Sequence, residues 1–320
     1  MCAIFGFLNY GKKISHKVLT KLLRELSVAA ECRGTDATGI SYVKENKMVT
    51  FKKAKPAHKV SLYFPKETTA VIGHTRFTTQ GSEKQNYNNH PFEGKTSEHS
   101  FSLAHNGVLY NDKELKKKYN LPETKIETDS YIAVQLLENQ KAVNFESIKT
   151  VAELVEGSFV FTILRDDNTL FLVKGSNPIT VYHFPKYGLY IYASTKEILE
   201  TALFEAGFTN RKHELISMHE GEILKISADG KTEKTEFEES DNFFNSTYRH
   251  YRDWWDYADT DVEDDDYISD LLMICSLYGV DRNNVELLLE YGYTVNEIED
   301  MLYNSNFFEE AVVEIKSMFI

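Results

Sequence analysis

Cys2 is the residue of this sequence with the clearest chemical potential. It follows Met1 and opens an apolar run at 2–7. Cysteine is small enough for the initiator methionine to be removed, and removal would leave a thiol and a free α-amine on one residue. A thiol that loses its proton is a good nucleophile, and an α-amine has an unperturbed pKa near neutrality. Cys2 could therefore supply nucleophile and base together, although an early cysteine in an apolar strand is often just a small buried hydrophobe.

Four polar clusters follow Cys2, and each falls at the end of an expected strand or in a loop. They occupy 33–39 (RGTDATG), 73–81 with 89–92 (GHTRFTTQG and NHPF), 104–107 (AHNG) and 127–130 (ETDS). Taken singly, each has a structural explanation. Asn-Gly is a common turn dipeptide, which predicts a turn at Asn106-Gly107, and Thr or Asp before a helix is a common N-cap.

The elements that must position these clusters alternate between strands and helices. Short segments rich in β-branched or aromatic residues predict strands at 2–8, 39–43, 71–77, 100–107, 159–165, 169–175, 179–184, 189–194 and 222–227. Apolar residues at helical spacing predict helices at 17–33, 128–139, 147–156 and 195–207, the last of them stopped by Gly207. This order of elements favours stacked antiparallel sheets with helices outside.

In their order after Cys2, the clusters resemble one family, the class II glutamine amidotransferases, which are N-terminal-nucleophile hydrolases. The family pattern is an N-terminal Cys followed by RGxDxxG, HTRxxT, NxHPF, HNG and ETD segments, and this chain has all six in that order within residues 2–230. Six ordered matches are specific where one would be weak. The resemblance implies an α+β fold, a four-layer α-β-β-α sandwich, for a domain at 1–240.

The resemblance also implies the catalytic residues. Hydrolysis of the glutamine side-chain amide needs a nucleophile, donors for the tetrahedral oxyanion and a grip on the free amino acid. Cys2 matches the nucleophile. Asn106 and Gly107 match the oxyanion donors, since a side-chain amide and a backbone N–H can aim at one point and glycine permits close approach.

Three further residues match the positions that hold the amino acid. A guanidinium suits the α-carboxylate, and Arg76 is the matching residue, with Thr79 adding a hydroxyl. Asp129 matches the carboxylate that binds the α-ammonium. The sequence departs from many members at Phe77, where they have Trp, and at Gln80, where they have His.

The remaining polar residues of the motifs are expected to be structural. We expect a buried ion pair between Arg33 and Asp36, hydrogen-bonding roles for the motif histidines, and a core position for Cys32. No His or Cys spacing predicts a metal site, and no phosphate-binding or dinucleotide-binding glycine motif is present, so no cofactor is expected. The motif histidines are His74, His90 and His105.

Charge divides the chain near residue 240. The whole chain has 36 basic and 49 acidic residues, and residues 241–320 hold 19 of the acidic and 4 of the basic ones. The run at 253–266 has 8 acidic residues and no basic one, which is typical of an extended linker. We predict an acidic linker at 241–265 and a small helical bundle at 266–320, its helices capped by Asp281, Thr294 and Asn306.

The amino-acid composition indicates in which cellular compartment the protein is expected. Three scattered cysteines form no disulfide framework, and neither a membrane span nor a signal peptide is predicted. We expect a cytoplasmic protein with no membrane or nucleic-acid partner.

Three hypotheses for the function remain open at this point. The first is a glutaminase that supplies ammonia to a separate synthase, because no synthase motif follows residue 240. The second is an amidohydrolase of a γ-glutamyl-containing metabolite. The third is a non-catalytic adaptor whose acidic tail binds a basic partner, and the complete motif set argues against it.

Overall fold

The computed structural model of the chain describes residues 2–238, 280–291, 293, 298, 301 and 305–317. The chain divides into two units, Met1–Arg252 and Asp253–Ile320. The linker predicted at 241–265 lies outside the described residues, so its extent stays a prediction.

Sheet A carries the N-terminal strand at its centre. Within residues 2–238 it has seven strands in the order β11-β9-β10-β1-β4-β2-β3, all antiparallel to their neighbours. Their bounds are β1 Ala3–Leu8, β2 Ala37–Lys44, β3 Lys47–Lys53, β4 Ala70–Arg76, β9 Thr180–Phe184, β10 Leu189–Ala193 and β11 Glu214–Leu215. Because Ala3 pairs with Thr75, the start of β1 lies beside the end of β4.

Sheet B carries the strand that contains Asn106. Within the same residues it has six strands in the order β13-β12-β8-β7-β6-β5, again antiparallel. Their bounds are β5 Phe92–Lys95, β6 Ser100–Leu109, β7 Gly157–Arg165, β8 Leu170–Lys174, β12 Glu222–Ile226 and β13 Thr232–Glu236.

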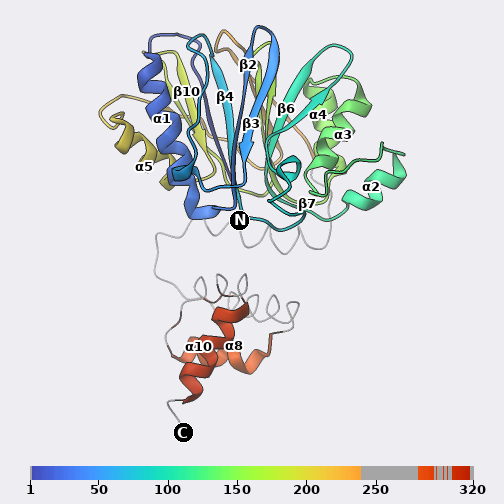
Figure 1. Cartoon of the computed structure of the whole chain (residues 1–320), viewed down its shortest axis with the longest axis vertical. Helices are drawn as coiled ribbons and strands as arrows, with labels where there is room; N and C mark the ends of the chain where they lie inside the picture. The colour runs from blue at the N-terminus through green and yellow to red at the C-terminus, as the bar shows by residue number, and fades with distance from the viewer. Residues whose placement is uncertain are drawn as a thin grey trace. The chain divides into compact units, whose positions relative to one another are not determined.

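Helices cover the outer face of each sheet, as Figure 1 shows. Helices α1 (His16–Ala29) and α5 (Lys196–Ala206) pack on sheet A, and α3 (Tyr131–Gln140) and α4 (Phe145–Leu154) pack on sheet B. A third apolar cluster, which includes Ile4, Ala104 and Val160, fills the space between the sheets. The predicted four-layer α-β-β-α sandwich is therefore confirmed.

Helix ends follow the expected local chemistry in α5 but not in α1. The Thr195 side chain caps α5, and Gly207 ends it in the left-handed region at φ 77°. Helix α1 passes at Ala30–Arg33 into a 3₁₀ turn, η1. The core position predicted for Cys32 is wrong, since Cys32 is exposed. The tighter winding of η1 takes this residue out of the buried stripe of α1.

The turn predicted at Asn106-Gly107 is also wrong, whereas the strand predicted at 100–107 is confirmed, because both residues lie inside β6. The partner of β6 is not the next segment of chain but β7, and Gly107 faces Phe159. Helices α2 (Asp112–Lys118), α3 and α4 fill the connection. A local turn signal is overridden here by long-range strand pairing. The sequence prediction also missed α2, the polar edge strands β3 and β13, and the short strands β5 and β11.

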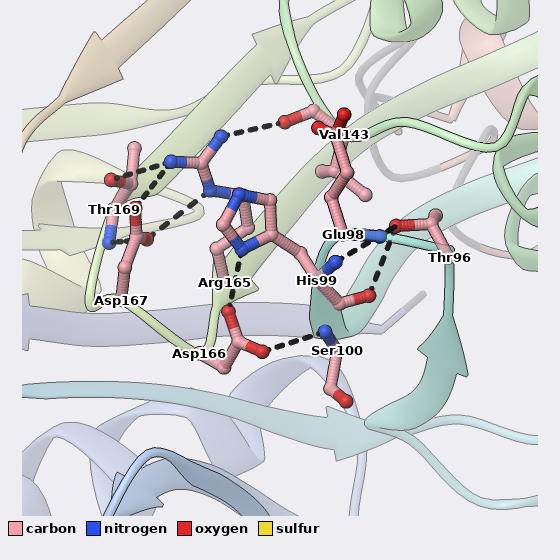
Figure 2. Close-up of polar contacts among 9 residues, drawn as sticks. All are labelled: Thr96, Glu98, His99, Ser100, Val143, Arg165, Asp166, Asp167 and Thr169. Atoms are coloured by element: carbon pink, nitrogen blue, oxygen red, sulfur yellow. Dashed lines mark hydrogen bonds and ion pairs between the residues drawn. The ribbon is translucent and has the colours of Figure 1, made fainter.

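Polar contacts anchor the start of β6, at the end opposite to Asn106 (Figure 2). Asp166 accepts hydrogen bonds from His99 Nδ1 and from the Ser100 backbone N–H, both at 2.8 Å. Arg165 donates to the Val143 carbonyl at 3.0 Å and pairs with Asp167. These contacts tie β6, β7 and the segment before α4 together, and so help to set the strand register that positions Asn106.

The described part of the second unit is helical. Helix α8 (Arg282–Glu290) is capped by Asp281, as predicted, and α10 spans Ser305–Ser317. Helix α10 begins at Ser305, so Asn306 lies inside the helix and the cap predicted there is wrong. The predicted cap Thr294 lies outside the described residues. The helices pack through apolar residues that include Val285, Leu288, Val312 and Ile315. Of the helices described, none has the length and apolar character of a membrane span.

Candidate active site

Cys2 lies immediately before β1, against the end of β4. Its Sγ is 3.4 Å from both the backbone nitrogen and the carbonyl oxygen of Phe77. Arg33 Nε donates to the Cys2 carbonyl at 3.0 Å. Phe77, the first residue after β4, therefore holds the thiol, and Arg33 holds the backbone of Cys2.

Burial raises the pKa of the Cys2 thiol, and the nearby Asp129 carboxylate raises it further. The Phe77 hydrogen bond and the Arg76 guanidinium act in the opposite direction, without overcoming burial. The thiol thus needs a base to become a nucleophile. These electrostatic effects also show that Cys2, Arg76 and Asp129 lie within range of one another's charges.

Arg76 ends β4 and is 2% exposed. Its Nη1 donates to Asn89 Oδ1 at 2.6 Å, and its Nη2 donates to the carbonyls of Gln80 at 2.5 Å and Gly81 at 2.8 Å. A guanidinium has five N–H donors. The Nε–H and one Nη1–H therefore have no partner among the described residues.

The loop after Arg76 is held by Asp36. The Thr78 backbone N–H donates to Asp36 Oδ2 at 2.7 Å, and the Asp36 backbone N–H donates to the Arg76 carbonyl at 2.9 Å. Phe77 is 45% exposed, and Thr79 is exposed. Arg33 and Asp36 thus each bind backbone at the site, and the ion pair between them stays a prediction.

Asn106 is fully buried, yet its side-chain amide has no hydrogen-bond partner among the described residues. Its backbone carbonyl accepts from Asn177 Nδ2 at 2.9 Å. The next residue, Gly107, has φ 143°, and a Cβ there would collide with the Ser158 carbonyl. Glycine is therefore required at 107, and a buried, preorganised amide group is available beside it.

Asp129 lies just before α3 and is 3% exposed. Its Oδ2 accepts from the Leu109 backbone N–H at 2.7 Å, and its Oδ1 lies 3.4 Å from the Ser130 hydroxyl. The carboxylate is thus bound to the end of β6, three residues beyond Asn106. Strand β6 positions the oxyanion candidates and the ammonium-binding candidate together.

Three buried histidines fill the space behind these residues. The rings of His74 and His90 stack at 4.2 Å, and the His74 Nε2 binds the His105 carbonyl at 2.9 Å. Burial lowers the pKa of all three imidazoles, that of His74 to about 3. They are neutral at physiological pH, and the hydrogen-bonding roles predicted for His74 and His105 are confirmed. His90 differs, because neither of its ring nitrogens has a partner among the described residues.

The predicted site residues come from three places in the fold that meet at one end of the sheets. Cys2 and Arg76 are at adjacent ends of β1 and β4, and β6 contacts both strands. Thr79 is the exception, since it lies exposed on the loop after β4. Within the described residues no group of three or more His, Cys, Asp or Glu side chains could hold a metal ion.

Sequence reasoning gave no role to three residues that support the site. Asn89 binds Arg76 and Ser130 lies against Asp129; both stand inside motifs, so their positions were available as a signal. Asn177 binds the Asn106 carbonyl from the loop between β8 and β9. No motif or spacing marks Asn177, and only the fold reveals it.

Comparisons with known proteins agree with this arrangement. The family described as "Glutamine amidotransferase domain" matches residues 74–201. A glutamine–fructose-6-phosphate aminotransferase (isomerizing) from Bacillus cereus is 33% identical over 189 residues, which are 57% of this chain and 30% of that protein. The enzyme of the same name from Staphylococcus aureus is 29% identical over 239 residues, 72% of this chain and 38% of that protein. The chain thus matches about a third of the length of these curated relatives.

A solved structure supports the fold. The glutamine phosphoribosylpyrophosphate amidotransferase of B. subtilis, complexed with ADP and GMP, superposes with a TM-score of 0.57 at 19% identity, over 75% of this chain and 50% of that one. The family match, the curated relatives and the two-sheet sandwich lead to one conclusion. This chain contains a glutamine amidotransferase domain of class II, the N-terminal-nucleophile type.

Proposed function

We propose that the protein hydrolyses the side-chain amide of glutamine through a thioester on Cys2 and releases glutamate and ammonia. The observation that carries the proposal is the buried Asn106 amide, which has no partner among the described residues. An unsatisfied buried polar group costs stability. In this proposal the Asn106 amide serves as a hydrogen-bond donor to the oxyanion that forms in the reaction.

The reaction begins at the thiol. With Met1 removed, the free α-amine of Cys2 accepts the Sγ proton, and the thiolate attacks the amide carbonyl carbon. The carbonyl π electrons move to oxygen, where the Asn106 Nδ2–H and the Gly107 backbone N–H stabilise the negative charge. Collapse of this intermediate breaks the C–N bond. The leaving nitrogen takes a proton from the ammonium and departs as ammonia.

The second half returns the enzyme to its starting state. Water attacks the γ-glutamyl thioester, giving a proton to the α-amine, and the C–S bond breaks. The sulfur recovers a proton, and glutamate leaves. Because burial raises the pKa of the thiol, the α-amine on the same residue is the base that the mechanism requires.

Substrate recognition is assigned to three side chains. Arg76 binds the α-carboxylate through its guanidinium, while its bonds to Asn89 and to the 80–81 carbonyls hold the group in place. Thr79 adds a hydroxyl from the loop after β4. Asp129 binds the α-ammonium through Oδ1, since Oδ2 is bonded to Leu109.

The ammonia acceptor is proposed to be a separate synthase. In the curated relatives the glutamine amidotransferase region is about a third of a longer protein. Here the described residues after 238 form apolar contacts between short helices. The acceptor chemistry is assigned, in this proposal, to another protein.

Incubation with glutamine tests the function. The protein should release glutamate and ammonia in equal amounts, and Cys2→Ala should abolish both while the circular dichroism spectrum stays unchanged. Cys32→Ala is the matched control, because Cys32 is exposed and has no role in the mechanism. Turnover that survives Cys2→Ala would contradict the proposal.

A further inference from the structure

A chain of three buried side chains leads from the candidate ammonium site into sheet B. The Ser130 Oγ lies 3.4 Å from Asp129 Oδ1 and 2.7 Å from the His105 Nδ1. On its far side the His105 Nε2 lies 3.4 Å from the Ser158 carbonyl oxygen. Asp129, Ser130 and His105 are 3%, 2% and 1% exposed, so water does not compete freely for these bonds.

The hydrogens of this chain can be arranged in two ways, because a neutral imidazole carries one N–H and a serine hydroxyl has one proton to donate. In the first arrangement the His105 Nδ1–H donates to Ser130, and the Ser130 hydroxyl donates to Asp129 Oδ1. In the second, the His105 Nε2–H donates to the Ser158 carbonyl, and the Ser130 hydroxyl donates to Nδ1. Asp129 Oδ1 is then left to accept from another donor.

The first arrangement suits a site for an α-amino acid. The Ser130 hydroxyl faces Asp129 Oδ1, while the Leu109 backbone N–H holds Oδ2. Because a carboxylate oxygen has two lone pairs, a substrate ammonium can donate to Oδ1 while the hydroxyl keeps its bond and fixes the carboxylate. No proton has to move within the chain of side chains when substrate binds. We propose that Ser130, oriented by His105, is a positioning residue that holds Asp129 for the substrate α-ammonium and so sets the selectivity for amides that carry an α-amine.

This inference rests on the proposed function and deepens it. The test compares glutamine with glutarate monoamide, which is glutamine without its α-amino group. In Ser130→Ala, kcat/KM for glutamine should fall about tenfold, mainly through KM, because one buried hydrogen bond that orients a charge is lost. The value for the monoamide should change less than about twofold. Ser130→Thr keeps the hydroxyl and should restore glutamine selectivity.

Binding of the products gives a second measurement that needs no turnover. The Kd of glutamate should rise about tenfold in Ser130→Ala, whereas the Kd of glutarate should stay the same. His105→Phe removes the ring nitrogen that orients the Ser130 hydroxyl and should show the same selective loss. Equal losses for the ligands with and without the α-amine would overturn the inference, and so would unchanged binding of both. A wild-type protein that hydrolyses neither amide would overturn the proposed function and this inference with it.

Discussion

The Arg76 guanidinium is held by Asn89, whose side-chain oxygen accepts from Nη1 at 2.6 Å. Asn89 is in turn fixed by the rest of its segment. Its Nδ2 donates to the Glu83 carbonyl at 2.8 Å, and the Lys52 Nζ donates to the Asn89 carbonyl at 2.6 Å. The residue proposed to bind the substrate carboxylate is therefore oriented from behind by an amide from a separate motif.

Asn89→Ala should weaken glutamine binding without removing any atom that touches substrate. Loss of a hydrogen bond to a charged group costs about 1.5–3 kcal/mol, so KM should rise by about tenfold or more while kcat changes little. Steady-state kinetics would measure this. Gln85→Ala, an exposed change in the same loop, is the control. An Asn89→Ala enzyme with the wild-type KM would show that Asn89 does not orient Arg76.

Asn106→Ala should mainly lower kcat and Asn88→Ala should mainly lower stability, although both asparagines are fully buried. The Asn88 side chain bonds to the Glu127 side chain and backbone, whereas the Asn106 amide has no partner among the described residues. Asn88→Ala should lower the free energy of unfolding by about 1–3 kcal/mol. Asn106→Ala should lower kcat by about 10²–10³-fold at a smaller cost in stability. Urea unfolding and kinetics on both variants test this contrast, and equal loss of stability would contradict it.

Acid should destabilise the fold through its buried histidines. The pKa of His74 is about 3 in the folded state, against about 6.5 when unfolded. Between these values the unfolded chain binds more protons, so stability is full above about pH 6.5 and falls as the pH drops toward 3, by up to about 1.4 kcal/mol per pH unit for each such group. His74→Gln keeps an N–H donor for the His105 carbonyl and should flatten the pH dependence of unfolding between 6 and 4. The exposed His219→Gln is the control, and identical slopes in all three proteins would contradict the account.

Removal of the acidic second unit should leave a folded glutaminase. Among the described residues, the apolar clusters of the two sheets and their helices include none beyond Phe237, and the site residues lie between 2 and 177. A chain ending at Arg252 should keep its melting temperature and basal turnover. If the acidic run is the contact for the synthase, the truncated chain should also lose a salt-sensitive affinity for it. An insoluble truncation, or one that melts far below the full chain, would contradict the separation.

Much of the sandwich could be predicted from sequence, because its strands are short, apolar and separated by clear helical periods. Cys2 and Arg76 were placed correctly at strand ends by their motifs. The prediction failed where tertiary structure overrides a local signal. Asn106-Gly107 reads as a hairpin turn, yet β6 continues through it to pair with a strand that follows three helices.

The supporting contacts of the site could not be predicted at all. The Asn177 bond to the Asn106 carbonyl joins residues 71 positions apart, and the Lys52 bond to the Asn89 carbonyl joins a polar edge strand to a loop. Such contacts depend on which side chains two sheets bring to one place. A single sequence holds no periodicity or motif that records them.

An intact-mass measurement tests most directly whether an N-terminal Cys2 is the nucleophile. The active protein is treated with a glutamine-like electrophile and its mass and modified peptide are determined. The account predicts a chain that lacks Met1 and carries one adduct, on Cys2, with glutamine protecting against labelling. An active protein that retains Met1, or an adduct on the exposed Cys32 in place of Cys2, would contradict it.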